Sequence, residues 1–121
     1  MIGYVMVGTK NMKRAAEFYD GLLAELGAKR AMEGDKFIAW SNGKGCMFSV
    51  CKPYDGNPST VGNGVMVALA APDQATVDRL YKKALELGGT DEGPAGPRGG
   101  NFYAGYFRDL DGNKLNAFCM G

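Results

Sequence analysis

The fold is decided near the end of the chain, by the stretch Phe102-Tyr103-Ala104-Gly105-Tyr106-Phe107-Arg108-Asp109-Leu110-Asp111-Gly112-Asn113-Lys114-Leu115-Asn116-Ala117-Phe118. Two runs rich in aromatic and aliphatic residues flank Asp111-Gly112. An Asp-Gly pair between alternating apolar runs is the strongest short signal for a tight hairpin. We therefore expect the chain to end in a β-hairpin.

The same plan occurs 69 residues earlier, in Phe37-Ile38-Ala39-Trp40-Ser41-Asn42-Gly43-Lys44-Gly45-Cys46-Met47-Phe48-Ser49-Val50, where Asn42-Gly43 takes the place of Asp111-Gly112. A hairpin that occurs twice indicates an internal repeat, and repeats constrain the whole fold.

The first half of the chain predicts the order β-α-β-β-β. Residues 1–8 are β-rich and uncharged, which is typical of a strand buried on both faces. Asn11 is expected to cap a helix whose apolar residues recur at helical spacing until Gly27. Three strands are then predicted, over residues 28–33, 36–41 and 45–52, before a polar loop rich in Gly and Pro over residues 53–64.

The second half repeats this order. A strand over residues 65–70 precedes a helix capped by Asp73 and ended by Gly88. A short strand over 90–92 and a loop over 93–101 lead to the closing hairpin. One such module has too few residues to bury its own sheet, so the two modules should pair.

The loop over residues 93–101 contains Gly96–Gly100 with Arg98. This segment could hold an anion with its backbone N–H groups and the guanidinium, but a lid or a linker is the better supported interpretation.

Composition narrows the classes of function. The chain has 121 residues and a net charge of +1 with no basic block, so neither nucleic acid nor a membrane is an expected partner. No leader-like or membrane-spanning segment is present in the sequence, which predicts a cytoplasmic protein. Three cysteines without a C-x-x-C spacing are expected to be reduced and structural.

In its order of elements the chain resembles the vicinal oxygen chelate superfamily, which includes glyoxalase I, bleomycin-resistance proteins, extradiol dioxygenases and methylmalonyl-CoA epimerase. The matching segments cover nearly the whole chain: Ile2 to Val7, Ala15-Ala16-Glu17-Phe18-Tyr19 with Leu26-Gly27, Pro53-Tyr54-Asp55-Gly56, Val67-Ala68-Leu69 and Asp109-Leu110-Asp111-Gly112-Asn113-Lys114-Leu115.

The resemblance implies an α+β fold in which two βαβββ modules form a curled mixed sheet around a cup, with the helices outside. It implies a single domain over residues 1–121, with repeats at about 1–58 and 59–121, and a homodimer as the usual assembly.

Metal-dependent members of that superfamily carry two His and two Glu ligands on the cup-facing side. The corresponding positions here are Tyr4, Met66, Asn116 and either Met47 or Ser49, and the chain contains no His. Divalent catalytic metals need about three converging His or carboxylate ligands. We therefore expect no metal and no other cofactor.

An apolar and aromatic cup with few polar groups is typical of a small-molecule pocket. The predicted cup residues are Tyr4, Met6, Met47, Ser49, Cys51, Met66, Phe102, Tyr106 and Asn116, with Phe37 and Arg108 near the edge. The residues predicted to contact a ligand are Tyr4, Met47, Ser49, Met66, Tyr106 and Asn116.

The favoured hypothesis is a metal-free small-molecule-binding protein without catalytic residues, with resistance by sequestration as one role, as in the bleomycin-resistance proteins. Two alternatives stay open. One is a metal-independent, glyoxalase- or epimerase-like lyase or isomerase in which Tyr4 or Cys51 moves a proton. The other is an interaction module whose cup is filled by its own bulky side chains, namely Tyr4, Met47, Met66 and Phe102.

Overall fold

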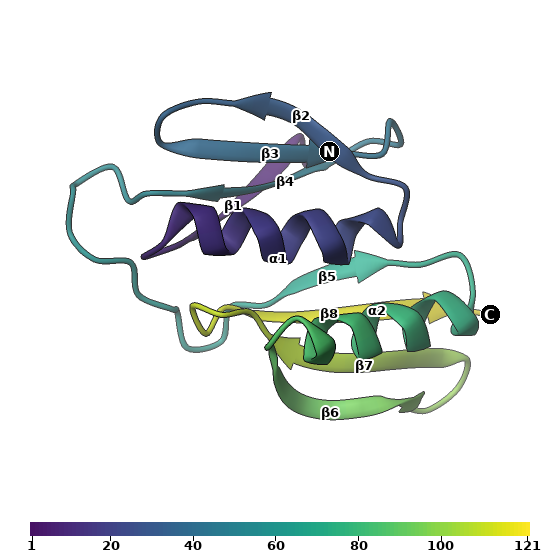
Figure 1. Ribbon diagram of the computed structural model, residues 1–121. Helices are drawn as coiled ribbons and strands as arrows, with labels where there is room; N and C mark the ends of the chain where they lie inside the picture. Colours follow the sequence, from purple (N-terminus) through teal and green to yellow (C-terminus); the bar gives the residue numbers. More distant parts are fainter.

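The computed structural model describes all 121 residues and confirms the α+β fold with two βαβββ modules. Figure 1 shows the two modules one above the other. The first contains β1 (Tyr4–Gly8), α1 (Met12–Ala24), β2 (Lys29–Glu33), β3 (Phe37–Ser41) and β4 (Met47–Cys51). The second contains β5 (Val67–Ala70), α2 (Gln74–Glu86), β6 (Thr90–Pro97), β7 (Phe102–Arg108) and β8 (Lys114–Met120).

Each module forms its own four-stranded mixed sheet, in the orders β1-β4-β3-β2 and β5-β8-β7-β6. The first strand of each module pairs in parallel with the last, and the other pairs are antiparallel. Both predicted hairpins are present, as β3–β4 and β7–β8. We refer to the two sheets as sheet A and sheet B.

Both helices begin where the sequence predicts. The Asn11 side chain accepts a hydrogen bond of 3.0 Å from Arg14 N, and Asp73 accepts one of 2.8 Å from Thr76 N. Such caps satisfy backbone N–H groups that the first helical turn leaves without partners. Gly27, with φ of 72°, follows α1 in a left-handed conformation that favours glycine.

The core lies between each sheet and its helix. Phe48 and Val50 of β4 point toward α1, where Tyr19 packs on Phe48 with ring centroids 4.5 Å apart. Leu115 and Ala117 of β8 point toward α2 in the same way. Burial of each large apolar side chain contributes about 1.5–3 kcal/mol before the entropy of ordering it is subtracted.

The strand β1 differs from the prediction of a strand buried on both faces. Tyr4 and Met6 are 60% and 45% exposed, whereas Val7 is buried. The reason is that β1 is an edge strand of sheet A and only one face of that sheet is covered by α1. The apolar residues of β1 therefore lie alternately in the core and on an exposed surface.

The strand β6 (Thr90–Pro97) is longer than predicted, because residues 93–97 belong to it rather than to the loop expected after residue 92. It is the edge strand of sheet B and is interrupted by register shifts around Gly93. Edge strands tolerate Gly and Pro because one row of their N–H groups needs no partner in the sheet. This tolerance explains why a Gly- and Pro-rich segment forms a strand here.

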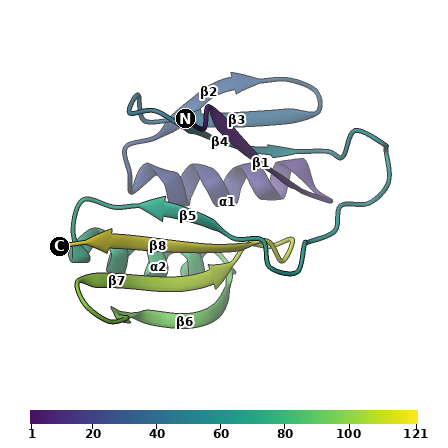
Figure 2. The same cartoon turned by 180° about the vertical axis from the view of Figure 1, so that it is seen from behind.

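The two modules are joined by their helices and by one turn. No strand of one sheet lies within 8 Å, Cα to Cα, of a strand of the other, whereas α1 and α2 are in contact. Both helices lie on one side of the molecule, and Figure 2 shows the opposite side, where neither sheet is covered by a helix. We call these uncovered surfaces the open faces of sheets A and B.

The turn between β7 and β8 docks on the first module. Asp109 is 5% exposed and accepts hydrogen bonds from the Tyr19 hydroxyl, at 2.6 Å, and from Asn113 Nδ2, at 2.9 Å. Asp111 accepts from the Thr9 hydroxyl at 2.6 Å. The Asp-Leu-Asp-Gly-Asn segment that predicts the hairpin therefore also connects the two modules.

Candidate functional site

The open face of sheet A is apolar and rich in methionine. It contains a hollow of about 250 Å³ whose lining side chains point away from α1. These residues are Tyr4, Met6, Met32, Phe37, Ala39, Met47 and Ser49. Thioether side chains adapt their shape to what they contact, so this surface can accept varied apolar groups.

The open face of sheet B combines aromatic and polar groups. Tyr106 of β7 lies directly opposite Asn116 of β8, and Ala68 of β5 lies on the other side of Asn116. Asn116 is 2% exposed, and its Oδ1 atom has no hydrogen-bond partner. This oxygen is itself shielded from solvent in the single chain, and a buried acceptor without a partner is unfavourable, so a donor brought to it would stabilise the site.

Two cations flank the ring of Tyr106. The Arg98 guanidinium lies 5.5 Å and the Lys114 ammonium 5.7 Å from the ring centroid. Arg98 also donates to the backbone carbonyls of Pro94 and Pro97 in β6, so two of its five N–H donors are already used within the protein. That contact gives no support to an anion cradle at Gly96–Gly100.

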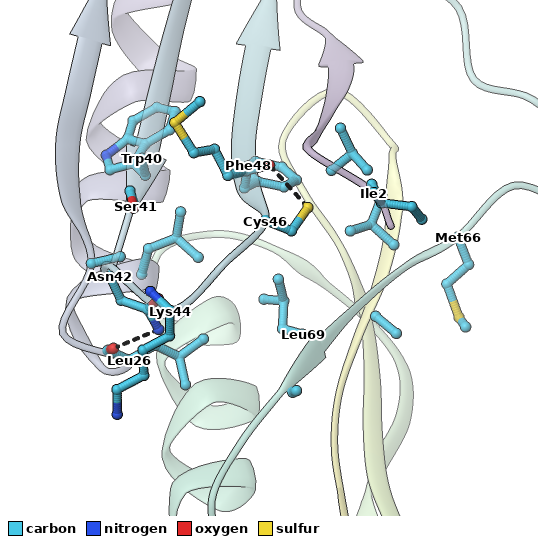
Figure 3. A pocket seen from close by; sticks show the side chains of 17 residues that line it. Ile2, Leu26, Trp40, Ser41, Asn42, Lys44, Cys46, Phe48, Met66 and Leu69 are labelled. Atoms are coloured by element: carbon cyan, nitrogen blue, oxygen red, sulfur yellow. Dashed lines mark hydrogen bonds between the residues drawn. The ribbon is translucent and has the colours of Figure 1, made fainter.

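A larger hollow of about 460 Å³ lies between the modules and is lined mainly by apolar side chains. Figure 3 shows Trp40 and Phe48 on one side of it and Leu69 of β5 on the other. Met66 lies at its far edge, and Met47 also contributes to its lining.

The six predicted ligand residues fall into separate places in the single chain. Tyr4, Met47 and Ser49 come together on sheet A, and Tyr106 lies beside Asn116 on sheet B. Met66 precedes β5 and borders the hollow between the modules. The two open faces are not joined into one cup within one chain.

Sequence reasoning missed Met32 and Lys114 as site residues. A register shift between Arg30 and Met32 breaks the alternation along β2, so its inward and outward positions could not be read from the sequence. Lys114 could have been found, because it lies two positions before Asn116 on the same strand and therefore on the same face.

The residues at the superfamily's metal positions do not fit a divalent catalytic metal. Tyr4 and Met47 are register partners on sheet A, and they offer a phenol and a thioether. Met66, Asn116 and the alternative Ser49 add a second thioether, an amide and a hydroxyl. No group of three His, Cys, Asp or Glu side chains converges anywhere in the structure. Such donors are poor ligands for the metals that these positions hold in metal-dependent members.

The titratable groups give little support to proton transfer. Burial raises the pKa of the Cys51 thiol, which disfavours the thiolate that a nucleophile or base requires. The strongest effect concerns Tyr19, whose pKa is raised by burial and by the neighbouring Asp109 carboxylate. Tyr19 lies in the core, so this shift belongs to the stability of the fold.

The chain belongs to the Glyoxalase/Bleomycin resistance protein/Dioxygenase superfamily, whose family model matches residues 1–117. A glyoxalase/bleomycin resistance protein from Albidiferax ferrireducens has a similar crystal structure, with a TM-score of 0.94 and 32% sequence identity. That similarity covers 100% of this chain and 99% of the other. A search of curated proteins found no match.

More distant structures share the fold. A glyoxalase/bleomycin resistance protein/dioxygenase family enzyme from Burkholderia phytofirmans has 15% identity and a TM-score of 0.79, with 98% of each chain covered. A lactoylglutathione lyase from Agrobacterium tumefaciens has 19% identity and a TM-score of 0.73, with 98% of this chain and 92% of the other covered. Neither helix of the present structure is long and apolar enough to cross a membrane.

Proposed function

We propose that this protein binds a small organic molecule on the open faces of its sheets, without a catalytic metal and without turnover. The observation that carries the proposal is Asn116, a buried amide with an unpartnered oxygen beside the aromatic ring of Tyr106. A ligand that donates a hydrogen bond to this oxygen would remove the cost of leaving it unsatisfied. Sequestration of a toxic compound is one role that such binding serves.

The same proposal makes a homodimer the functional unit. Each open face forms only one wall of a pocket, and the large apolar side chains Tyr4, Met6 and Met32 remain 60%, 45% and 50% exposed on sheet A. A second copy that places its sheet B over sheet A would cover these side chains and complete the cup. Isologous pairing of this kind forms two equivalent pockets in one dimer.

A metal-independent lyase or isomerase is less well supported. Its proton-transfer group would be Tyr4 or Cys51, and the raised pKa of Cys51 opposes that role. Tyr4 is 60% exposed in the chain and has no side-chain hydrogen bond, so nothing positions it as a base. No specific observation favours catalysis over binding.

A thermal-shift screen tests the proposal. The purified protein is heated with Zn²⁺, Ni²⁺, Mn²⁺ or Fe²⁺, with and without chelator, and with aromatic antibiotics, thiol conjugates and acyl-CoA compounds. We expect an organic class to raise the unfolding midpoint, the metals to have no chelator-reversible effect, and mass spectrometry to recover the bound compound unchanged. A chelator-reversible metal shift or a chemically altered compound would contradict the proposal.

A further inference from the structure

A polar hollow of about 530 Å³ lies at one end of sheet B, where the segment between the modules passes the ends of β7 and β8. Its lining includes two cationic side chains, Arg108 and Lys114, and no carboxylate. The other lining residues are Val61, Gly62, Asn63, Gly64, Val65 and Met66.

The charges in this hollow are not balanced. Arg108 and Lys114 are direct register partners across β7 and β8, and like charges placed opposite each other in a sheet repel. Arg108 is paired with Glu92, with 2.7 Å between Nε and Oε1, and also donates to the Gly112 carbonyl. Lys114 makes no ion pair, and its ammonium lies 5.7 Å from the ring centroid of Tyr106. An anion here would offset the repulsion.

The loop that closes the hollow presents further donors. The backbone N–H groups of Gly62, Asn63 and Gly64 make no hydrogen bond within the protein, although Gly62 accepts one of 3.2 Å from Val65 N. Free N–H groups next to cationic side chains are typical of sites for carboxylate and phosphate oxygens.

The hollow lies next to the polar part of the proposed binding face, because both include residues of β8. Lys114 and Asn116 are two positions apart on β8 and project from the same face, about 7 Å from each other along the strand. The Oδ1 atom of Asn116 has no hydrogen-bond partner, and Tyr106 neighbours both polar groups, since it is the register partner of Asn116 and its ring lies 5.7 Å from the Lys114 ammonium.

We propose that the ligand is a small organic anion, whose carboxylate or phosphate binds at Lys114, Arg108 and the 62–64 amides and whose hydroxyl or N–H group donates to Asn116. The inference rests on the proposed function and specifies its ligand class. The apolar body of such a ligand would lie against Tyr106.

Chemical-shift titration of the ¹⁵N-labelled full chain tests this assignment. The probes are inorganic phosphate, 4-hydroxybenzoate and its neutral counterpart 4-hydroxybenzamide. We expect an anionic probe to shift the amide signals of Gly62 and Gly64, and 4-hydroxybenzoate to shift the Asn116 side-chain amide as well.

Lys114→Gln should weaken anion binding at least about tenfold, because a charge-assisted contact is lost. Lys82→Gln removes the same charge from α2 and should leave binding unchanged.

The outcomes separate the two proposals. Binding of phosphate alone assigns a phosphoryl group, and binding of 4-hydroxybenzoate alone assigns a carboxylate. The anion site is overturned if neither anion shifts these signals, or if Lys114→Gln binds as the wild type does. If the neutral amide binds the open face as tightly as the acid does, the anion site fails while small-molecule binding stands. Circular dichroism of both variants checks that they are folded.

Discussion

The hydroxyl of Tyr19 donates a hydrogen bond of 2.6 Å to Oδ2 of Asp109 and thereby joins helix α1 of the first module to the β7–β8 turn of the second. Asp109 also accepts from the backbone N–H groups of Asp111 and Asn113, each at 2.9 Å. The carboxylate is 5% exposed, so these donors replace its hydration. The turn motif thus holds the two modules in one arrangement.

Removal of the Tyr19 hydroxyl should destabilise the protein. We expect Tyr19→Phe to lower the free energy of unfolding by about 1–3 kcal/mol, because a buried carboxylate loses a donor. Urea unfolding measures the loss. Tyr103→Phe is the matched control, since its hydroxyl donates at the same distance of 2.6 Å to an exposed carboxylate, that of Asp78. Equal effects of the two variants would contradict a special role for the buried pair.

Alkaline pH should weaken the same contact. The pKa of Tyr19 is raised above its ordinary value of 10.0 in the folded protein, so the unfolded chain releases this proton first. The stabilisation is therefore complete below about pH 10 and is lost as the pH rises above that value. We expect the difference in unfolding free energy between wild type and Tyr19→Phe to shrink between about pH 10 and pH 11. A constant difference over this range would contradict the assignment.

Asn116 should be dispensable for stability and required for binding. Asn116→Leu removes an unpartnered acceptor while keeping the branched shape of the side chain, so we expect the free energy of unfolding to stay the same or to rise by about 1 kcal/mol. Affinity for a compound that stabilises the wild type, measured by calorimetry, should fall at least about tenfold. Asn57→Leu, on the exposed loop between the modules, is the control. Marked destabilisation by Asn116→Leu would mean that the amide has a structural partner.

The three cysteines should differ in reactivity. Cys46 is exposed, Cys51 is half-buried with a raised thiol pKa, and Cys119 is buried. We expect iodoacetamide at pH 8 to modify Cys46 first, as followed by peptide mass spectrometry, because alkylation requires an accessible thiolate. Faster modification of Cys51 than of Cys46 would restore Cys51 as a candidate nucleophile.

The open face of sheet A should control assembly. We expect Met6→Glu to shift the protein from dimer to monomer in analytical ultracentrifugation, because a carboxylate would be placed in an apolar contact. Lys82→Glu, on the exposed side of α2, should leave the association unchanged. A wild-type protein that is monomeric at all concentrations, or a Met6→Glu variant that still dimerises, would contradict the proposed pairing.

Local signals in the sequence were sufficient for the elements. Asn11 and Asp73 marked both helix starts, and Asp111-Gly112 and Asn42-Gly43 marked both hairpins, because caps and tight turns depend on a few neighbouring residues. The same reasoning failed for β6, where pairing with β7 outweighs the low strand preference of Gly and Pro.

The sequence by itself determined the repeat, the superfamily and the absence of histidine at its metal positions, since these depend only on residue order and type. Only the tertiary structure showed that Asn116 Oδ1 has no partner, that Lys114 faces Arg108, and that Tyr19 meets Asp109 across the modules. These relationships depend on strand register and on packing between segments that are distant in the chain. A one-residue shift in the register of β8 would move Lys114 and Asn116 to the other face of sheet B.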